Sequence, residues 1–173
     1  QKARVQRIER AARDMAELGT ALLLMAREDH AQPGGGCRVA AVVEEAVEKQ
    51  RHILASKPVA VDVQTDPELV VAADCGLVDI LVSNLVRNAF SYTDAGSVTI
   101  HQDSRSLVIS DTGRGLPGDA IDQAFLRHFR DMASTGAGIG LSLVKQICDR
   151  YGWQVRLESG EHQGTTVSVL FAR

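Results

Sequence analysis

Three short segments constrain this chain more than any other feature of its 173 residues. They read Asn-Leu-Val-Arg-Asn-Ala at 84–89, Asp-Thr-Gly-Arg-Gly at 111–115 and Gly-Ala-Gly-Ile-Gly-Leu at 136–141. The first puts amides on a helix, the second puts an acid in a glycine turn, and the third opens a helix with glycines. Each segment is weak evidence alone, but the order and spacing of the three predict a nucleotide pocket. We expect the rest of the chain to support that pocket or to connect it to another domain or protein.

Composition narrows the class of protein. The length suits one full domain plus an appendage. Hydrophobic residues make up 45% of the chain but aromatic residues only 4%, so the core must rest on Val, Leu, Ile and Ala. The net charge of -3 argues against a nucleic-acid binder, which usually carries a basic surplus. The three cysteines are odd in number and lack CxxC spacing, so we predict no zinc site, no disulfide framework and a reducing compartment.

The first part of the chain reads as one long helix over residues 2–30. Its apolar residues follow a seven-residue pattern that Gly19 interrupts, and arginines line the opposite face. This stripe predicts packing either on the neighbouring domain or in a bundle completed by a missing helix and a second chain. The helical pattern already runs at Gln1, so we expect the chain to be a piece of a longer protein. No apolar run reaches the ~18 residues of a membrane span, and no signal peptide is seen.

A glycine-rich run after Pro33 predicts a linker at 32–37, which separates a segment at 1–31 from a domain at 38–173. In that domain we expect helices at 39–56, 75–92, 118–125 and 139–151, strands at 59–65, 69–73, 97–101, 106–110, 153–158 and 165–171, and a mobile loop at 126–135. Asp74 is placed as the N-cap of helix 75–92. The predicted fold is a two-layer α/β sandwich (α+β), with a mixed sheet of about five strands covered on one face by about three helices and preceded by one long helix.

The helix at 75–92 carries the first candidate site residues. Asn84, Asn88 and Ser91 lie within roughly 60° of one another at the edge of its buried arc. A buried, unpaired amide costs about 1–3 kcal/mol, so one interpretation is that these amides tie down neighbouring backbone. The other is metal binding, because an amide oxygen is a hard, neutral ligand that suits Mg²⁺.

The two glycine segments also have alternatives. Asp111 follows a buried strand and could accept a hydrogen bond from an exocyclic amine such as that of adenine, but Asp-x-Gly-x-Gly is often only a turn. Gly136, Gly138 and Gly140 precede a helix, where backbone amides hold anions, although the same run could be a flexible hinge. No Lys-Ser/Thr follows Gly140 and no strand precedes the run, so it is neither a Walker loop nor a Rossmann fingerprint.

Together, the segments resemble the ATP-binding catalytic domain of sensor histidine kinases, in the superfamily that also holds gyrase, MutL and the ninety-kilodalton chaperones. The resembling motifs are the N box at 84–93, the first glycine box at 111–116, the F box at 121–127, the second glycine box at 136–141 and the terminal Gly-Thr at 164–166. Residues 7–27 are similar to the second helix of the kinase dimerisation hairpin. The resemblance therefore covers almost the whole chain.

The resemblance implies roles for individual residues. Asn84 would coordinate Mg²⁺, Asn88 would sit beside the phosphates, and Asp111 would bind the adenine amine. Tyr92 would pack near the base, and Arg127 would reach the terminal phosphate, so that Asn84 and Arg127 are the implied catalytic residues. The other implied nucleotide-binding residues are Ser91, Gly113, Gly115, Gly136, Gly138, Ile139, Gly140, Leu141 and Thr165.

The implied cofactors are ATP and Mg²⁺. The implied reaction is transfer of the γ-phosphoryl group of ATP to a histidine nitrogen, for relay to an aspartate of a response regulator in a two-component system. Positioning and charge neutralisation supply most of the catalysis in phosphoryl transfer, which suits a site without a nucleophile of its own. The implied partners are a response regulator and, in the intact kinase, a second copy through the N-terminal helix. The expected location is a cytoplasmic domain of a protein anchored in the inner membrane by segments upstream of this chain.

Three departures from the family pattern stand out. Ser91 stands where Lys or Arg is common, with Arg87 or Arg127 as candidate replacements, and Asp122 stands where the first F-box phenylalanine is expected. None of the five histidines is followed by the Glu/Asp-x-Arg/Lys run of a phosphoacceptor. We therefore expect the acceptor histidine to lie upstream and this chain alone not to phosphorylate itself. The alternatives are a degenerate module that acts by binding a partner, and a serine kinase of the anti-sigma type.

Overall fold

The computed structural model describes residues 12, 15, 16, 18–23, 26, 36–121, 124, 125 and 140–172. Beyond residue 36 its elements are β1 (Cys37–Arg38), α2 (Val39–Gln50), the 3₁₀ helix η1 (Arg51–Leu54), β2 (Val59–Gln64), β3 (Val70–Val71), α3 (Cys75–Tyr92), β4 (Gly96–Gln102), β5 (Ser106–Asp111), α4 (Gly118–Ile121), α5 (Gly140–Arg150), β6 (Gln154–Gly160) and β7 (Gly164–Leu170). The described residues between 12 and 26 are helical, in agreement with that part of the predicted helix at 2–30. The rest of that helix, most of the linker at 32–37 and the loop at 126–135 lie outside the described residues.

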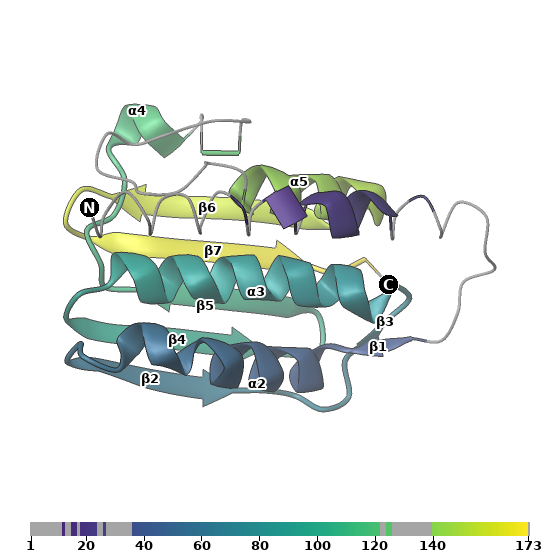
Figure 1. Ribbon diagram of the computed structural model, residues 1–173, viewed down its shortest axis with the longest axis horizontal. Helices are drawn as coiled ribbons and strands as arrows, with labels where there is room; N and C mark the ends of the chain where they lie inside the picture. The colour runs from purple at the N-terminus through teal and green to yellow at the C-terminus, as the bar shows by residue number, and fades with distance from the viewer. Residues whose placement is uncertain are drawn as a thin grey trace.

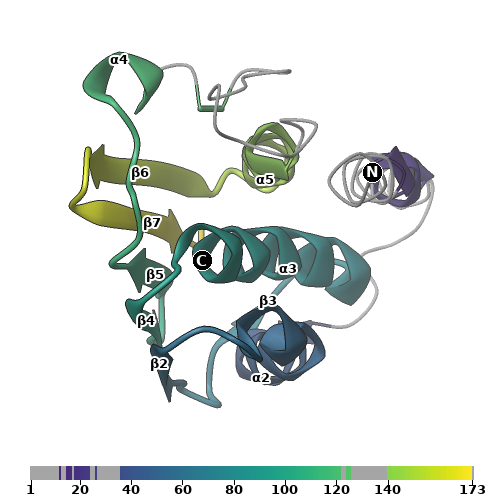
Figure 2. The same ribbon diagram turned by 60° about the vertical axis from the view of Figure 1, so that its left-hand side comes forward.

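The main sheet has five strands in the order β2-β4-β5-β7-β6. β2 pairs with β4 in parallel, and the other three pairings are antiparallel, so the sheet is mixed. Helices α2, α3 and α5 lie side by side on one face of this sheet, and the other face carries no described helix (Figures 1 and 2). The predicted two-layer fold is therefore confirmed.

The alternation of side chains along the strands explains why the sheet is covered on one face only. Successive side chains of a strand point to opposite faces, and the buried residues of the central strands are every second one. These are Val98 and Ile100 on β4, Leu107 and Ile109 on β5, and Val167 and Val169 on β7. They form one core with the buried residues of the helices, above all those of α3.

Helix α3 runs over the centre of the sheet with the bounds predicted from the sequence. Its buried residues include Leu77, Leu81, Leu85 and Phe90, which are at most 2% exposed. The carboxylate of Asp74 accepts a hydrogen bond of 2.7 Å from the backbone N–H of Gly76, as expected of the N-cap. This helix is therefore fixed at its start by a local cap and along its length by the core.

Three predicted elements differ from those observed by more than two residues. The helix predicted at 118–125 is described as α4 only over Gly118–Ile121, and Ala124 and Phe125 lie in a turn. Helix 39–56 ends earlier: α2 stops at Gln50, and η1 continues as a 3₁₀ turn to Leu54, a common way for an α-helix to tighten at its end. The strand predicted at 69–73 shortens to β3, which does not join the main sheet. Instead β3 pairs with β1 in a separate two-stranded sheet.

The cysteines correct the sequence analysis. Cys37 on β1 and Cys75 at the start of α3 form a disulfide, although they are 38 residues apart in the sequence. The prediction that no disulfide forms is wrong because the fold brings their Cα atoms to 5.1 Å, and no spacing pattern announces such a contact. The disulfide also does not suit the predicted reducing compartment. Cys148 is a free, buried thiol.

Among the residues that the structure describes, no helix combines the length and the hydrophobicity needed to cross a bilayer.

Candidate nucleotide-binding site

Asn84 is enclosed between helices. Its side chain is 0% exposed, its Nδ2 donates 2.8 Å to the carbonyl of Ile80, and its Oδ1 accepts 2.6 Å from Nη2 of Arg87. A Cβ on Gly140 would lie 2.6 Å from the same Oδ1, so the first residue of α5 is pressed against this amide. The amide of Asn84 is thus hydrogen-bonded to the helix backbone and to a buried arginine. This agrees with the interpretation in which the amide has a structural role.

The other candidate residues of α3 lie toward its C-terminal end. Asn88, Ser91 and Tyr92 are each partly exposed. Within the described part of the chain, no hydrogen bond of the Asn88 side chain is found, which leaves its amide oxygen available to a ligand. Arg87, named as a candidate replacement for the cation absent at Ser91, is only 8% exposed and is engaged with Asn84.

Asp111 is the last residue of β5, where the strand leads into the glycine turn. Its Oδ1 accepts a hydrogen bond of 2.8 Å from the backbone N–H of Gly113. Burial raises the pKa of the Asp111 carboxyl above its usual range, and hydrogen bonds from the backbone N–H groups of Gly113 and Thr165 oppose part of that rise. A half-buried carboxylate with acceptor capacity to spare can recognise an amine donor.

The turn after Asp111 packs directly on the end of α3. A Cβ on Gly113 would lie 2.3 Å from the carbonyl oxygen of Tyr92, so only glycine fits there. That same oxygen accepts a hydrogen bond of 3.4 Å from the backbone N–H of Arg114. The predicted acid turn and the predicted N-box helix therefore meet at Tyr92.

The β6–β7 turn supports the acid turn from the other side. Gly164 has φ +80°, and a Cβ there would lie 1.9 Å from the backbone oxygen of Asp111. Gly115 has φ +67°, and its Cβ would lie 1.9 Å from the backbone oxygen of Gly160. Thr165 pairs with Asp111 across the two strands. Both glycines are required by positive φ and by close backbone contact.

Three residues in or beside this site were not assigned a role from the sequence. The hydroxyl of Ser159 accepts a hydrogen bond of 2.8 Å from the N–H of Leu116 and donates one of 2.8 Å to the carbonyl of Gly164. It thereby joins the turn after Asp111 to the β6–β7 turn. The guanidinium of Arg114 lies 4.8 Å from the centre of the Tyr92 ring. Lys57 reaches the C-terminal end of α3 from a distant loop. A cation between two glycines could have drawn attention to Arg114, but no sequence signal marks Ser159 or Lys57.

The structure brings together three pairs of predicted residues: Asn84 with Gly140, Tyr92 with Gly113, and Asp111 with Thr165. Leu141 follows Gly140 at the start of α5 and is partly exposed. The remaining predicted residues, Arg127, Gly136, Gly138 and Ile139, lie outside the described residues, as does Asp122.

The donor set available for a metal ion is limited. In the part of the chain that the structure describes, no three His, Cys, Asp or Glu side chains gather as a metal site. A single amide oxygen together with phosphate oxygens is the arrangement that Mg²⁺ accepts, because this ion usually keeps several waters and binds through the phosphates of a substrate. The partly exposed amide of Asn88 fits that requirement better than the enclosed amide of Asn84.

Comparisons with known proteins agree on one family. Residues 74–173 match the model of histidine kinase-, DNA gyrase B-, and HSP90-like ATPases. The chain is 30% identical over 182 residues to the sensor protein IrlS of Burkholderia pseudomallei, an alignment that covers 96% of this chain and 37% of IrlS. The chain therefore spans little more than a third of that relative.

Two solved structures share the fold. The mycobacterial sensor histidine kinase MprB superposes with a TM-score of 0.70 at 24% identity, over 79% of this chain and 96% of that one. Full-length ShkA in complex with AMPPNP superposes with a TM-score of 0.72 at 21% identity, over 91% of this chain and 36% of that one.

Proposed function

The chain belongs to the family of histidine kinase-, DNA gyrase B-, and HSP90-like ATPases, and from this premise we propose that it is the ATP-binding catalytic domain of a sensor histidine kinase. In this proposal it transfers the γ-phosphoryl group of ATP to a histidine outside the chain, for relay to a response regulator. The names of its relatives support the kinase, and the AMPPNP complex of ShkA supports an adenine nucleotide as the ligand.

One observation carries the proposal: the turn of Asp111 packs on the end of α3 at Tyr92. This contact puts the half-buried carboxylate and the glycine-lined turn next to the backbone of Tyr92, whose ring lies 4.8 Å from the guanidinium of Arg114 in the same turn. A base with an exocyclic amine suits these groups, because the carboxylate can accept a hydrogen bond from the amine. We therefore assign base recognition to Asp111, Gly113 and Tyr92.

We propose that Asn88, and not Asn84, is the magnesium ligand. The Asn84 amide is closed to solvent and holds Ile80 and Arg87, so its oxygen would have to leave Arg87 to meet an ion. Asn88 lies one helical turn further along α3 and is partly exposed. When bound with ATP, Mg²⁺ neutralises phosphate charge. Asn84 instead supports the start of α5, where Gly140 and Leu141 are proposed to lie beneath the phosphates.

The remaining assignments extend to parts of the site outside the described residues. We propose that Arg127 reaches the terminal phosphate and that Gly136, Gly138 and Ile139 continue the phosphate loop that ends at Gly140. Ser91 and Thr165 are proposed to border the nucleotide, with Gly115 shaping the turn. The proposed organisation is a hairpin helix at 1–31, a linker at 32–37 and the catalytic domain at 38–173. In the intact protein, the helix would pair two copies, and an upstream segment would anchor the kinase in the inner membrane.

A binding and a labelling experiment test this function together. Calorimetric titration of the chain with ATP and Mg²⁺ should give saturable binding, and the Asp111→Ala variant should lose it. With radiolabelled ATP, the chain alone should incorporate no label, whereas a version extended upstream to include the acceptor helix should be labelled. Absence of ATP binding by the wild type would favour a degenerate module that acts through a partner. Label on the chain alone would contradict an acceptor outside it.

A further inference from the structure

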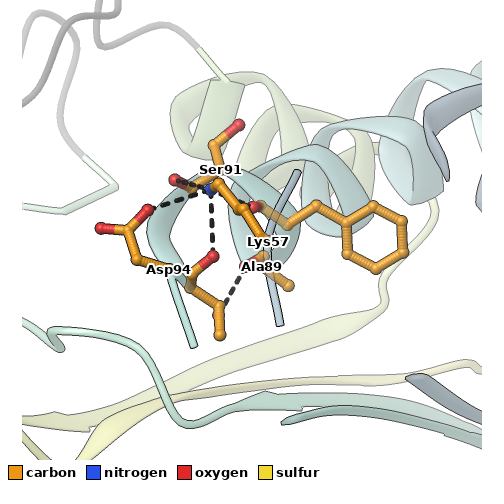
Figure 3. Close-up of polar contacts among 6 residues, drawn as sticks. Lys57, Ala89, Ser91 and Asp94 are labelled. Atoms are coloured by element: carbon orange, nitrogen blue, oxygen red, sulfur yellow. Dashed lines mark hydrogen bonds and ion pairs between the residues drawn. The ribbon is translucent and has the colours of Figure 1, made fainter. Parts of the chain in front are cut away.

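The ammonium group of Lys57 lies at the C-terminal end of α3, although Lys57 belongs to the loop between η1 and β2. Its Nζ donates to the backbone carbonyls of Phe90 at 3.0 Å, Ser91 at 3.2 Å and Thr93 at 3.0 Å. Figure 3 shows Lys57 with Ser91 and Asp94, and Oδ1 of Asp94 also lies 3.2 Å from the Lys57 Nζ. An ammonium group has three N–H donors, so the carbonyls use its whole donor capacity.

The end of α3 needs such a group. The last carbonyls of a helix lack partners within the helix, and together they carry partial negative charge. No basic residue occurs in the last turn of α3, so the helix does not supply its own cation. The hydroxyl of Thr93, a buried residue, donates a hydrogen bond of 2.8 Å to the carbonyl of Ala89. Lys57 donates to the carbonyls of the next two residues, Phe90 and Ser91. Asp94 is 91% exposed, so its ion pair with Lys57 adds little.

The backbone held by Lys57 is the backbone on which the acid turn rests. Tyr92 lies between Ser91 and Thr93, whose carbonyls both accept from Lys57. The carbonyl of Tyr92 in turn accepts from Arg114 and leaves space only for a glycine at 113. Any movement of this last turn would therefore shift Tyr92 relative to Asp111.

We propose that Lys57 is a positioning residue for nucleotide binding: it fixes the last turn of α3 so that Tyr92 and the Asp111 turn keep one geometry toward the base. This inference rests on the proposed function. The role proposed for Lys57 differs from that of the cation that relatives often carry at the position of Ser91. The three donors of Lys57 are spent on backbone carbonyls, so it acts on the site through the helix end and not through a contact to phosphate.

The test compares four variants by calorimetric titration with ATP and Mg²⁺, under conditions where circular dichroism shows each to be folded. Lys57→Met keeps the length of the stem but removes the charge, and Lys57→Arg keeps the charge. Lys49→Met removes a lysine that is 53% exposed on α2, away from this turn. Val63→Ala weakens the core under β2 without touching the end of α3, and controls for a general loss of stability.

Lys57→Met should raise the Kd for ATP roughly tenfold, because small displacements of positioning groups have large effects. Lys57→Arg should recover most of the affinity, and both controls should bind as the wild type does. A wild-type Kd in Lys57→Met, or an equal weakening in Val63→Ala, would overturn the inference.

A second readout needs no nucleotide. Amide hydrogen exchange at Thr93 and Arg114 should be roughly tenfold faster in Lys57→Met, because their hydrogen bonds are made at the turn that Lys57 holds. Exchange in the β5–β7 ladder should be unchanged. If the wild type fails to bind ATP, the proposed function fails, and unchanged exchange at these two amides would separately refute the positioning by Lys57.

Discussion

A Cβ on Gly140 would lie 2.6 Å from Oδ1 of Asn84, closer than such contacts occur in proteins. The amide of Asn84 cannot turn aside without cost, because it is held by the carbonyl of Ile80 and by Arg87 and is fully enclosed. The first residue of α5 and the middle of α3 are thus fitted to each other. Two of the motifs recognised from the sequence meet at this contact.

The first prediction concerns Gly140→Ala. In the middle of a helix, alanine usually stabilises relative to glycine by roughly 0.5–1 kcal/mol, and at a first helical residue such as Gly140 the gain is at most that. Here we expect the opposite, a loss of about 1–3 kcal/mol in the free energy of unfolding, because the added methyl group overpacks the contact. Denaturant unfolding measures it. Gly118→Ala is the matched control, since no atom of the described residues lies within 4 Å of a Cβ there, and it should be neutral or stabilising. An equal change in the free energy of unfolding of the two variants would show that the Asn84 side chain moves aside without cost.

The second prediction separates the two asparagines of α3. Asn84→Ala should lower the free energy of unfolding by about 1–3 kcal/mol, because it removes a buried acceptor from Arg87. Asn88→Ala should change stability by no more than about 0.5 kcal/mol. Nucleotide titrations with and without Mg²⁺ should show that Asn88→Ala loses most of the magnesium-dependent gain in affinity. The reverse pattern would return the metal-ligand role to Asn84.

The third prediction follows from the raised pKa of Asp111. As the pH falls through that raised pKa, the carboxyl gains a proton and loses its capacity to accept from the amine of the base. The affinity of the wild type for ATP should therefore fall at a higher pH than an exposed aspartate would dictate. Asp111→Asn should bind at least tenfold more weakly at neutral pH, since a hydrogen bond to a charged group contributes about 1.5–3 kcal/mol.

The stability of the ligand-free protein should respond to Asp111 in the opposite sense. A carboxyl whose pKa is raised by folding contributes most below its unfolded pKa, and that contribution is lost as the pH rises through the folded pKa. Asp111→Asn should therefore be at least as stable as the wild type at neutral pH, and the wild type should gain on the variant as the pH falls. Unfolding curves of both proteins across this pH range check the sign. A wild type that loses stability relative to Asp111→Asn as the pH falls would contradict a raised pKa.

The fourth prediction concerns the three cysteines. Because Cys37 and Cys75 are joined and burial raises the pKa of Cys148 to about 12, the native, unreduced protein should show no thiol reactive to a colorimetric disulfide reagent. Unfolding without reductant should expose one thiol, and unfolding with reduction should expose three.

Reduction should also lower stability. Closing a loop between cysteines 38 residues apart contributes about 3–4 kcal/mol by the chain-entropy estimate. The double variant Cys37→Ser with Cys75→Ser should start at the lower stability and show no further response to reductant. Two reactive thiols in the native protein would mean that the disulfide does not form.

Much of the fold follows from local patterns. The alternation along β4, β5 and β7 predicts one buried face because side chains of a strand alternate between two environments. Helix α3 begins and ends as predicted because its cap, Asp74, and its apolar periodicity are both local signals. The short β3 was placed less well, since its partner β1 is a two-residue strand that no local signal marks.

The site was predicted in part for the same reason. The residue types of the site and their order can be read from the sequence alone: an amide-bearing helix, an acid in a glycine turn, and glycines opening a helix. Such motifs are visible because their residues are neighbours in the chain. The roles proposed for Arg127 and for Gly136, Gly138 and Ile139 remain predictions.

How those groups are used depends on the tertiary structure. It enclosed Asn84, against which the first residue of α5 packs, and left Asn88 partly exposed, although both lie on one helix. It joined Cys37 to Cys75 and brought Lys57 to carbonyls 33 to 36 residues away. These contacts depend on how helices and loops pack over a shared sheet, and that packing is a property of the whole domain and not of any local stretch of sequence.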